Sequence, residues 1–528
     1  MKKNFKAFAS RLLMAFLLVI LSAGIVFAQG LMDKKIIYVP MDDRPVNYQY
    51  VIETAKAAGM DLITPPAECL PRIAIAGDVE KLWGWIFENA KIAHTVILSA
   101  DLSIYGGLVS SRRHDMSRMA INKMIGNFSK IKRINPDIKF YVFSTIMRTP
   151  KQSVGSVEPD YYEKYGPMIF RITSLKDKAD QTELDKEEKS ELKKLFSEVP
   201  AKHLDDWFER RAKNLAANKK LMNLVRTGVI DYFILCRDDS SPFSQSRLEY
   251  RTLVKNSRGL NENNFNSFMG ADEIGMLLFA RAANTIERKQ PKFFVVYNEG
   301  AGVKTIPAYE DCEISKTVDA HIMASGSLPA SSIDESEFVL FVNTPFDGKV
   351  REAESDENLS IESPYLIDFV LKIKQLSDTA KKIVIADVSY ANGSDNAFMQ
   401  MLSARKLLEK ICAYSGWNTA GNTIGCVIGQ AILSDYINPE DRYRVILKRF
   451  LDDWAYQANI RKEIYTAILK PENLPRVNIS FEKLVKLRYL AKKKMLEFAA
   501  KNLKDFHVAD LNIDLPWKRL FEVQIDIK

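Results

Sequence analysis

The feature that most constrains the fold is a series of short apolar runs, each bounded by turn residues. Val, Ile and Phe fill these runs almost without interruption, whereas a strand with one wet face would alternate apolar and polar residues. Strands buried on both faces are typical of a parallel sheet covered by helices. We expect strands at 36–40, 62–64, 95–99, 139–144, 231–236, 293–297, 338–342 and 382–386.

Amphipathic stretches separate these runs, for example at 116–131 and 366–376, where apolar residues recur at helical spacing. A strand followed by a helix, repeated about eight times, predicts an α/β fold with parallel strands. A (β/α)8-like barrel and two successive doubly wound sheets both fit this order. We favour the barrel; for the two-sheet alternative, the polar stretch 285–292 is the best internal boundary.

Two segments are expected as additions to a main α/β catalytic domain spanning 29–437. Residues 151–229 are rich in Lys, Glu and Asp with spaced apolar positions such as Leu192 and Trp207, which indicates an inserted helical hairpin or lid. Residues 438–528 are expected to form a C-terminal helical region. Pro439 suits the first turn of its first helix.

The N-terminus has the pattern of a secretion signal. Four basic residues precede an uncharged apolar run at 12–28, and small residues lie before Gln29, so we expect a signal peptide at 1–28 that is cleaved after Ala28. The alternative is an uncleaved membrane anchor, because a run of about 17 residues is the lower limit for crossing a bilayer. The protein is therefore expected to be secreted or extracytoplasmic, with membrane contact only through an uncleaved signal.

Charge and cysteine content exclude several functions. The formal charge of +8 falls to +4 once the four basic residues of the signal are removed, and the remaining basic residues are interleaved with acids. We therefore expect no nucleic-acid partner. The five cysteines lie far apart without CxxC spacing, so neither a zinc site nor a disulfide framework is expected.

Polar residues gather directly after the expected strands. In any parallel α/β fold these positions share one edge, the carboxyl ends of the strands, where ligands bind. One Asp, Ser or Asn there often caps a helix or closes a turn, but these clusters hold several. We therefore predict a polar site, and the expected substrate-binding residues are Asp42, Asp43, Arg44, Asn47, Asp101, Tyr105, Arg148, Asp387, Tyr390, Asn392, Asp395, Asn396, Trp417, Asn418 and Asn422.

The adjacent carboxylates Asp238 and Asp239 are the sharpest catalytic signal. Two neighbouring carboxylates in a partly dry site do not both ionise readily, so one is able to act as an acid. Glycoside cleavage needs this division between a proton donor and a base, nucleophile or orienting group. Glu299, in a Gly-rich segment, is a further catalytic candidate. Adjacent acids also bind hard metals through oxygen, so the pattern is not specific.

The segment 414–423 allows two interpretations. Trp417 would stack on a sugar face while Asn418 and Asn422 bond its hydroxyls. Alternatively, the segment is a Gly-rich helix packed against the sheet, with Trp417 in the core.

Six motifs resemble a large bacterial family of domains of unknown function. They are VPMDDRPVN (39–47), ADLSIYGGLVSSR (100–112), RDDSSPFS (237–244), GADEIG (270–275), ADVSYANGSDN (386–396) and GWNTAGNTIG (416–425), and together they cover nearly the whole chain after the signal. The resemblance implies no established activity, but it supports placing these motifs in one site. Sugar hydrolysis is inferred instead from paired acids on an exported α/β scaffold, by analogy with hexosaminidases that carry neighbouring aspartates at a barrel strand end.

The leading hypothesis is an exported glycoside hydrolase acting on an envelope or environmental glycan, with N-acetylhexosamine-containing glycans as one candidate. It uses no cofactor or metal, and Asp238 and Asp239 take the acid and orienting roles. A metal-dependent phosphate or ester hydrolase is the alternative, with Mg²⁺ or Ca²⁺ among Asp42, Asp43, Asp238, Asp239 and Asp387. A non-catalytic glycan-binding envelope protein is the third. GxSxG, HExxH and Walker motifs are absent from the sequence, which argues against serine hydrolases, zincins and P-loop enzymes.

Overall fold

The computed structural model describes residue 31, residues 33–238 and residues 240–528. The expected signal peptide and Asp239 lie outside the described residues. Among the helices of the described residues, none is both long enough and apolar enough to cross a membrane.

The first half of the chain forms a sheet of six parallel strands, which we call the first sheet. Its spatial order is β2-β1-β3-β4-β5-β6. The register places Ser99 opposite Phe143 and Ile146 opposite Arg237, so the carboxyl ends of β3, β4 and β5 lie along one edge. The strands are β1 (Lys35–Val39), β2 (Asp61–Ile63), β3 (Thr95–Ser99), β4 (Lys139–Ile146), β5 (Tyr232–Arg237) and β6 (Phe265–Met269).

The second half forms a separate parallel sheet of five strands, the second sheet, in the order β13-β11-β9-β7-β8. Asp387 and Asn343 are register partners at its carboxyl edge. A short parallel pair, β10 (Arg351–Glu352) with β12 (Tyr390–Ala391), lies in the loops beyond this edge. The strands of the second sheet are β7 (Lys292–Tyr297), β8 (Leu328–Pro329), β9 (Phe338–Asn343), β11 (Lys382–Asp387) and β13 (Ile411–Ser415).

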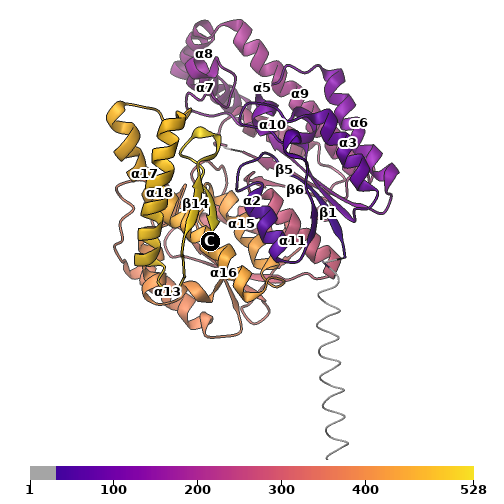
Figure 1. Ribbon diagram of the computed structural model, residues 1–528. Coiled ribbons are helices and arrows are strands. Elements are labelled where there is room, and N and C mark those ends of the chain that lie inside the picture. The colour runs from indigo at the N-terminus through magenta and orange to yellow at the C-terminus, as the bar shows by residue number, and fades with distance from the viewer. Residues whose placement is uncertain (1–30, 32, 239) are drawn as a thin grey trace, which may run out of the picture.

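The expected α/β class with parallel strands is therefore confirmed; the described strands form two separate sheets, as in the two-sheet alternative, and the barrel that we favoured is not confirmed. No pairing among the described strands joins the two sheets or closes either of them. The physical reason lies in α11 (Ile274–Glu287) and α15 (Ala420–Leu433), which share one apolar core with β1 and β9. These helices lie near the centre of the molecule, and their apolar core includes strands of both sheets (Figure 1). The stretch 285–292 runs from the last turn of α11 to the first residue of β7.

Glycines make the contact between α11 and α15 possible. Gly421, Gly425 and Gly429 recur every four residues and so lie on one face of α15. A Cβ on Gly425 would lie 2.1 Å from Cγ of Glu273, and one on Gly429 would lie 2.6 Å from Cγ of Met276. Gly421 and Gly425 belong to the GWNTAGNTIG motif; Gly425 packs against the start of α11, whereas a Cβ on Gly421 would lie 2.3 Å from the carbonyl oxygen of Met269 at the end of β6, so close packing explains both without a ligand.

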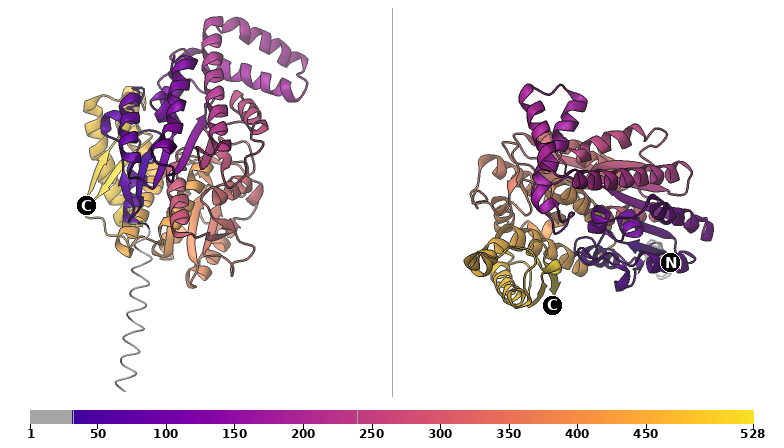
Figure 2. Two further views of the ribbon diagram at one scale, coloured as in Figure 1. Left: turned by 90° about the vertical axis from the view of Figure 1, so that its right-hand side faces the viewer. Right: turned by 90° about the horizontal axis from the view of Figure 1, so that it is seen from above.

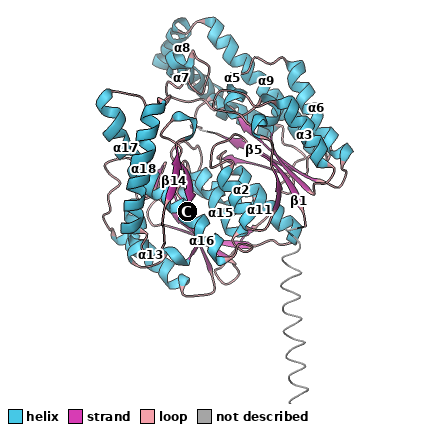
Figure 3. Ribbon diagram, in the orientation of Figure 1, coloured by secondary structure: helices cyan, strands magenta, loops and turns pink. Residues whose placement is uncertain are grey.

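Helices cover both outer faces, as Figure 3 shows by colour. On the first sheet, α3, α6 and α9 bury Trp83, Phe128 and Leu221 against β3 and β4. On the second sheet, α13 and α14 bury Phe369 and Phe398 against β9 and β11, while α18 (Phe481–Asn502) belongs to the same apolar cluster and packs on the π-helix Phe450–Ile460. The remaining bounds are α2 (Gln49–Ala57), α3 (Val79–Ala90), α4 (Ala100–Tyr105), α5 (Leu108–Arg113), α6 (Arg118–Ile134), α10 (Gln245–Lys255), α12 (Ile314–Ala324), α13 (Pro364–Ser377) and α14 (Asn396–Ala404).

The segment 151–229 contains α7 (Tyr162–Gln181), α8 (Lys186–Glu198) and α9 (Ala201–Arg226). In Figure 2, α7 and α8 project from the body of the molecule. The capping box of Asp185 and Glu188 begins α8, a helix with no buried residue. Such an exposed helix depends on local capping because it has little packing to stabilise it.

The C-terminal region is not wholly helical. After α16 (Pro439–Arg449), a π-helix (Phe450–Ile460), α17 (Arg461–Ile464) and α18 (Phe481–Asn502), the chain ends in an antiparallel pair, β14 (Leu511–Asp514) and β15 (Gln524–Ile527). The hydroxyl of Tyr50 donates to the carbonyl of Val523 at 2.8 Å, which ties this pair to α2 in the first half. The connection between β14 and β15 thereby reaches the carboxyl edge of the first sheet.

Candidate functional site

A cleft of about 320 Å³ lies at the carboxyl edge of the first sheet. Loops after β1, β4, β5 and β6 form one wall, and loops of the second half, with the β14–β15 connection, form the other. Its polar lining includes Arg44, Arg112, Arg148, Asp238, Asp272, Asn392, Asn418 and Trp517. The cleft therefore draws on both halves of the chain.

Arg44 is held by two buried carboxylates. Its guanidinium donates to the two oxygens of Asp272 at 2.5 and 3.1 Å, and its Nε donates to Asp42 at 3.0 Å. Asn47 donates to both carboxylates, at 2.9 and 3.2 Å. Burial lowers the pKa of Arg44, but the charges of Asp272 and Asp42 outweigh it and hold the pKa well above its ordinary value. This cluster forms a rigid, charge-compensated corner of the cleft.

Asp43 lies beside this corner and has a different environment. Its carboxylate accepts a hydrogen bond from the indole of Trp517 at 2.7 Å, and the Trp517 ring also faces the guanidinium of Arg44. Burial raises the pKa of Asp43 to about 6, although the bond from Trp517 acts in the opposite direction. A carboxyl group with this pKa holds a proton in part of the molecules near neutral pH, as a general acid requires.

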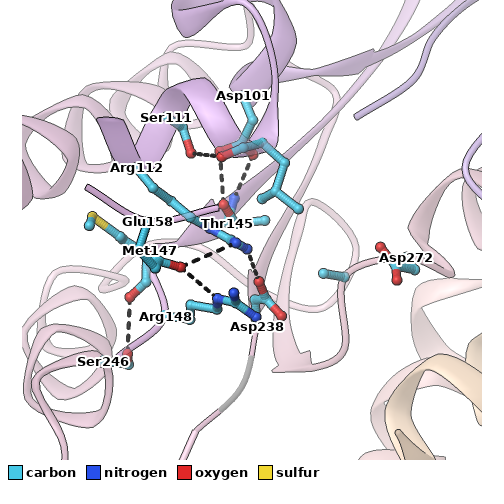
Figure 4. A network of polar contacts seen from close by, with 12 residues as sticks. Asp101, Ser111, Arg112, Thr145, Met147, Arg148, Glu158, Asp238, Ser246 and Asp272 are labelled. Atoms are coloured by element: carbon cyan, nitrogen blue, oxygen red, sulfur yellow. Dashed lines mark hydrogen bonds and ion pairs between the residues drawn. The ribbon is translucent and has the colours of Figure 1, made fainter. Parts of the chain in front are cut away.

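Asp238 follows β5 and is the partly exposed carboxylate of the cleft, with 19% of its side chain accessible. Arg112, on α5, donates to Asp238 and also lies 3.4 Å from the buried Glu158. Glu158 in turn accepts from Nε of Arg148 at 2.7 Å. Figure 4 shows Arg112 between Asp101 and Asp238, with Asp272 on the opposite side of the view. Asp239, the other half of the expected pair, lies outside the described residues.

Asp101 and Tyr105 lie behind this network rather than in the lining. Asp101 accepts from the backbone N–H and the hydroxyl of Thr145 at 3.0 and 2.8 Å, which links β3 to β4. Burial raises the pKa of Asp101 to about 6. Tyr105 is buried and its ring stacks on His114 with centroids 4.7 Å apart. Both residues support the wall of the cleft.

The second half contributes Asn392 and Asn418 to the lining. Both have positive φ, near 60°, and the N–H of Asn392 donates to the carbonyl of Asn418 at 2.8 Å. The amide of Asn392 donates to Glu352, while its buried Oδ1 has no hydrogen-bond partner among the described residues. An orphaned acceptor beside a cleft is suited to a ligand hydroxyl.

Trp417 and Asn422 have structural positions. Trp417 is 2% exposed and packs on Val46 and Phe521, so the core interpretation applies and not the sugar platform. Asn422 accepts from the backbone N–H groups of Ala271 and Asp272 at 2.9 and 3.0 Å, and so fixes the loop after β6.

Four further expected residues lie at the carboxyl edge of the second sheet, outside the lining of the cleft. Asp387 and Asp395 both accept from the amide of Asn343, at 3.0 and 3.3 Å. Burial, together with the neighbouring charge of Asp395, raises the pKa of Asp387 to about 7. Tyr390 lines a separate cavity with Asp395. Asn396, the first residue of α14, donates to the side chains of Asn358 and Asn459 at 2.9 and 3.2 Å. The residues expected from the sequence motifs to form one site therefore lie at two separate sites, the cleft of the first sheet and the carboxyl edge of the second sheet.

Glu299 does not join the cleft. Its side chain is 54% exposed and lies 3.7 Å from Lys372. Gly300 beside it approaches the chain so closely that a Cβ would lie 2.2 Å from the carbonyl oxygen of Phe346. This approach explains the Gly-rich segment, and the expectation of a catalytic Glu299 finds no support in its position.

Among residues 33–238 and 240–528, no group of three His, Cys, Asp or Glu side chains converges as ligands for a metal ion. Arg44 and Asn47 bond Asp42, Arg112 bonds Asp238, and Asn343 bonds Asp387. Asp42, Asp238 and Asp387, which belong to the alternative metal site, are thus engaged with cationic or amide partners, and Asp43 accepts from the indole of Trp517.

The sequence-based expectations missed Asp272, Arg112 and Trp517. Asp272 follows β6, whose sequence FNSFM has polar residues at its second and third positions and was not expected as a strand. Arg112 lies within the ADLSIYGGLVSSR motif, but on a helix rather than directly after a strand. Trp517 reaches the cleft only because the C-terminal pair packs on α2. The sequence did contain a signal for two of these residues, because Asp272 lies in the GADEIG motif and Arg112 ends the ADLSIYGGLVSSR motif.

The fold and the site together define an α/β protein with two parallel sheets and a polar cleft at the carboxyl ends of its strands. Residues 36–526 match the family described as "Protein of unknown function (DUF4127)", and the chain belongs to that family. No curated protein matches the chain. No solved structure matches it either.

Proposed function

We propose that the protein is an exported glycoside hydrolase whose sugar substrate binds in the cleft lined by Arg44, Asp238 and Trp517. The observation that supports this most directly is the partly exposed Asp238 carboxylate, held by Arg112 at the end of β5. A carboxylate at a strand end in a polar cleft suits acid, base or nucleophilic work on a glycosidic bond. The signal pattern of residues 1–28 supports export.

Glycoside cleavage also requires a proton donor. Asp43 is the described carboxyl group next to the cleft whose pKa, at about 6, suits that role, and Trp517 orients it. Asp238 would then act as base or nucleophile. Asp239, which the sequence places next to Asp238, is the alternative candidate for the proton donor. Separate substitutions of Asp43 and Asp239 distinguish the two candidates for the proton donor.

The rest of the cleft suits a polyhydroxylated ligand. Guanidinium groups of Arg44 and Arg148 donate hydrogen bonds, and Oδ1 of Asn392 is a buried acceptor without a partner among the described residues. Trp517 is half-buried and lines the cleft, and its indole, with the guanidinium groups of Arg44 and Arg519 over the ring, adds aromatic surface of the kind that sugars often contact. Envelope or environmental glycans, including those with N-acetylhexosamines, are the proposed substrates.

The mature chain, residues 29–528, is tested against a panel of chromogenic glycosides with and without EDTA. We expect hydrolysis that survives EDTA and falls by about 100-fold or more in Asp238→Asn, with a similar loss in Asp43→Asn or Asp239→Asn. Glu299→Gln is the matched control, because Glu299 is exposed and lies outside the cleft lining. Hydrolysis unaffected by Asp238→Asn would rule out this assignment.

One observation favours a second candidate, glycan binding without turnover. Both carboxylates in the described lining, Asp238 and Asp272, form ion pairs with arginines, an arrangement suited to a fixed binding surface. This candidate predicts saturable binding of oligosaccharides without hydrolysis of any glycoside. Hydrolysis that EDTA abolishes would instead support the metal-dependent alternative.

A further inference from the structure

A second cavity opens at the carboxyl edge of the second sheet. Its volume is about 390 Å³, and its described lining shares no residue with that of the cleft. Segments after β9 and β11 and the first turns of α13 and α14 form its walls. The residues that matter here are Phe346, Asp347, Arg351, Glu357, Tyr390 and Asp395.

Asp395 is the buried carboxylate of this cavity, and its orientation is fixed. One oxygen caps α14 by accepting from the N–H groups of Ala397 and Phe398 at 3.0 and 3.2 Å. The other accepts from the amide of Asn343 at 3.3 Å. A carboxylate held from two sides is a directed acceptor for a ligand hydroxyl or ammonium group.

An aromatic wall stands beside this carboxylate. Phe346 is 51% exposed, and its ring stacks on Tyr365 with centroids 4.8 Å apart and planes inclined by 28°. Tyr365 thus covers part of the ring while half of the residue stays accessible. The carbonyl of Phe346 accepts from the N–H of Ala301 at 3.0 Å, next to the close approach of Gly300. The backbone that carries the ring is therefore fixed as well.

The rim is polar and negatively charged. Arg351 lies 2.8 Å from Asp347 and 2.6 Å from Glu357, so its charge is compensated. With Asp395, the lining holds three carboxylates against one guanidinium. Two hydroxyls add hydrogen-bonding capacity: that of Tyr390 donates to the Glu357 carbonyl, and the buried Oγ of Ser363 has no partner among the described residues. An anionic ligand would be repelled here.

We propose that this cavity is a second saccharide-binding site, selective for neutral or amino sugars. The apolar face of a pyranose would lie on Phe346, and its hydroxyl or amino groups would bond Asp395 and the polar rim. An exposed aromatic ring beside directed polar groups is the combination that sugar recognition uses. The site is independent of hydrolysis in the cleft, because it needs neither Asp238 nor turnover.

The test uses residues 29–528 carrying Asp238→Asn, so that hydrolysis does not consume the probe. Chitotetraose and cellotetraose are titrated as neutral probes, and tetragalacturonate as an anionic one, by isothermal calorimetry. Phe346→Ala should weaken binding of a neutral probe by about 10-fold, since aromatic contact and buried area are both lost. Tyr390→Phe, which keeps the ring, should weaken it less.

Met119→Ala is the matched control, because Met119 is 81% exposed on α6 and lies outside both linings. It should bind the probes as the parent does. The inference is overturned if Phe346→Ala binds every neutral probe as tightly as the parent, if no neutral probe binds the parent, or if tetragalacturonate binds best. A protein that hydrolyses no glycoside yet loses binding through Phe346→Ala would refute the proposed function and support this site.

Discussion

Arg44 and Asp272 form a bidentate ion pair between residues 228 positions apart, with distances of 2.5 and 3.1 Å. Arg44 follows β1 and Asp272 follows β6, which are not neighbours in the first sheet. The pair therefore joins loops across the carboxyl edge rather than along one strand pair. Both side chains are nearly inaccessible, at 7% and 5% exposure, so little water screens the pair.

Replacing Asp272 by Asn should destabilise the fold strongly. Asp42 would still compensate the charge of Arg44, but the Asn amide offers one acceptor oxygen in place of two, and losing a buried charge-assisted hydrogen bond costs about 2 kcal/mol. Urea unfolding measures the change. Arg444→Ala is the control, because its pair with Glu440 is exposed on both sides and should contribute less than about 1 kcal/mol. Equal effects of the two changes would contradict the importance of the Arg44–Asp272 pair.

Glu310 should make stability depend on pH. Burial raises its pKa from 4.5 to about 7, while the bond from the N–H of Gly421 acts against this rise. The folded state thus binds the proton more tightly than the unfolded state. The stabilisation is fully present below pH 4.5 and is lost as pH rises through 7, with an upper limit of about 3 kcal/mol.

Glu310→Gln keeps the acceptor for Gly421 and removes the titration. The difference in unfolding free energy between Glu310→Gln and the parent should therefore shift in favour of the variant between pH 5 and pH 8. Chemical denaturation at several pH values measures it. A difference that stays constant across this range would show that Glu310 does not titrate there.

Gly425→Ala should disrupt the packing of α15 on α11. The added Cβ would lie 2.1 Å from Cγ of Glu273 and 2.8 Å from the ring of His321, so one helix must move. We expect a loss of about 2 kcal/mol or more, as for an overpacked core. Gly84→Ala, in α3, meets nothing within 4 Å and should instead stabilise by about 0.5 kcal/mol. Thermal unfolding of both variants checks the sign of each effect.

Substitution of Trp517 should affect ligand binding, whereas substitution of Trp417 should affect the stability of the fold. Trp517 lines the cleft and bonds Asp43, whereas Trp417 is buried against Val46 and Phe521. Trp517→Phe should weaken binding or turnover in the cleft and shift the basic limb of the pH profile upward, because the bond that lowers the pKa of the proton donor Asp43 is removed. Trp417→Phe should lower the unfolding temperature instead. The opposite pattern would place the ligand at Trp417.

The sequence pattern did not predict β6 and β13. β6 and β13 are both edge strands of five residues, and in β6 the polar Asn266 and Ser267 interrupt the apolar run. Strands in the sheet interiors, such as β3 and β9, were expected at nearly their observed bounds. The missed β6 also concealed Asp272, because a residue is expected in the site only when the strand before it is identified.

The amino-acid sequence by itself determined the α/β class, the buried parallel strands and the position of polar motifs at their carboxyl ends, because burial on both faces imposes an apolar composition that local pattern detects. Only the tertiary structure decided that two sheets form, that Trp417 is buried while Trp517 lines the cleft, and that Asp238 and Asp395 lie in different cavities. Those outcomes depend on contacts between distant segments, such as the approach of α15 to α11 through Gly425, which no local spacing specifies.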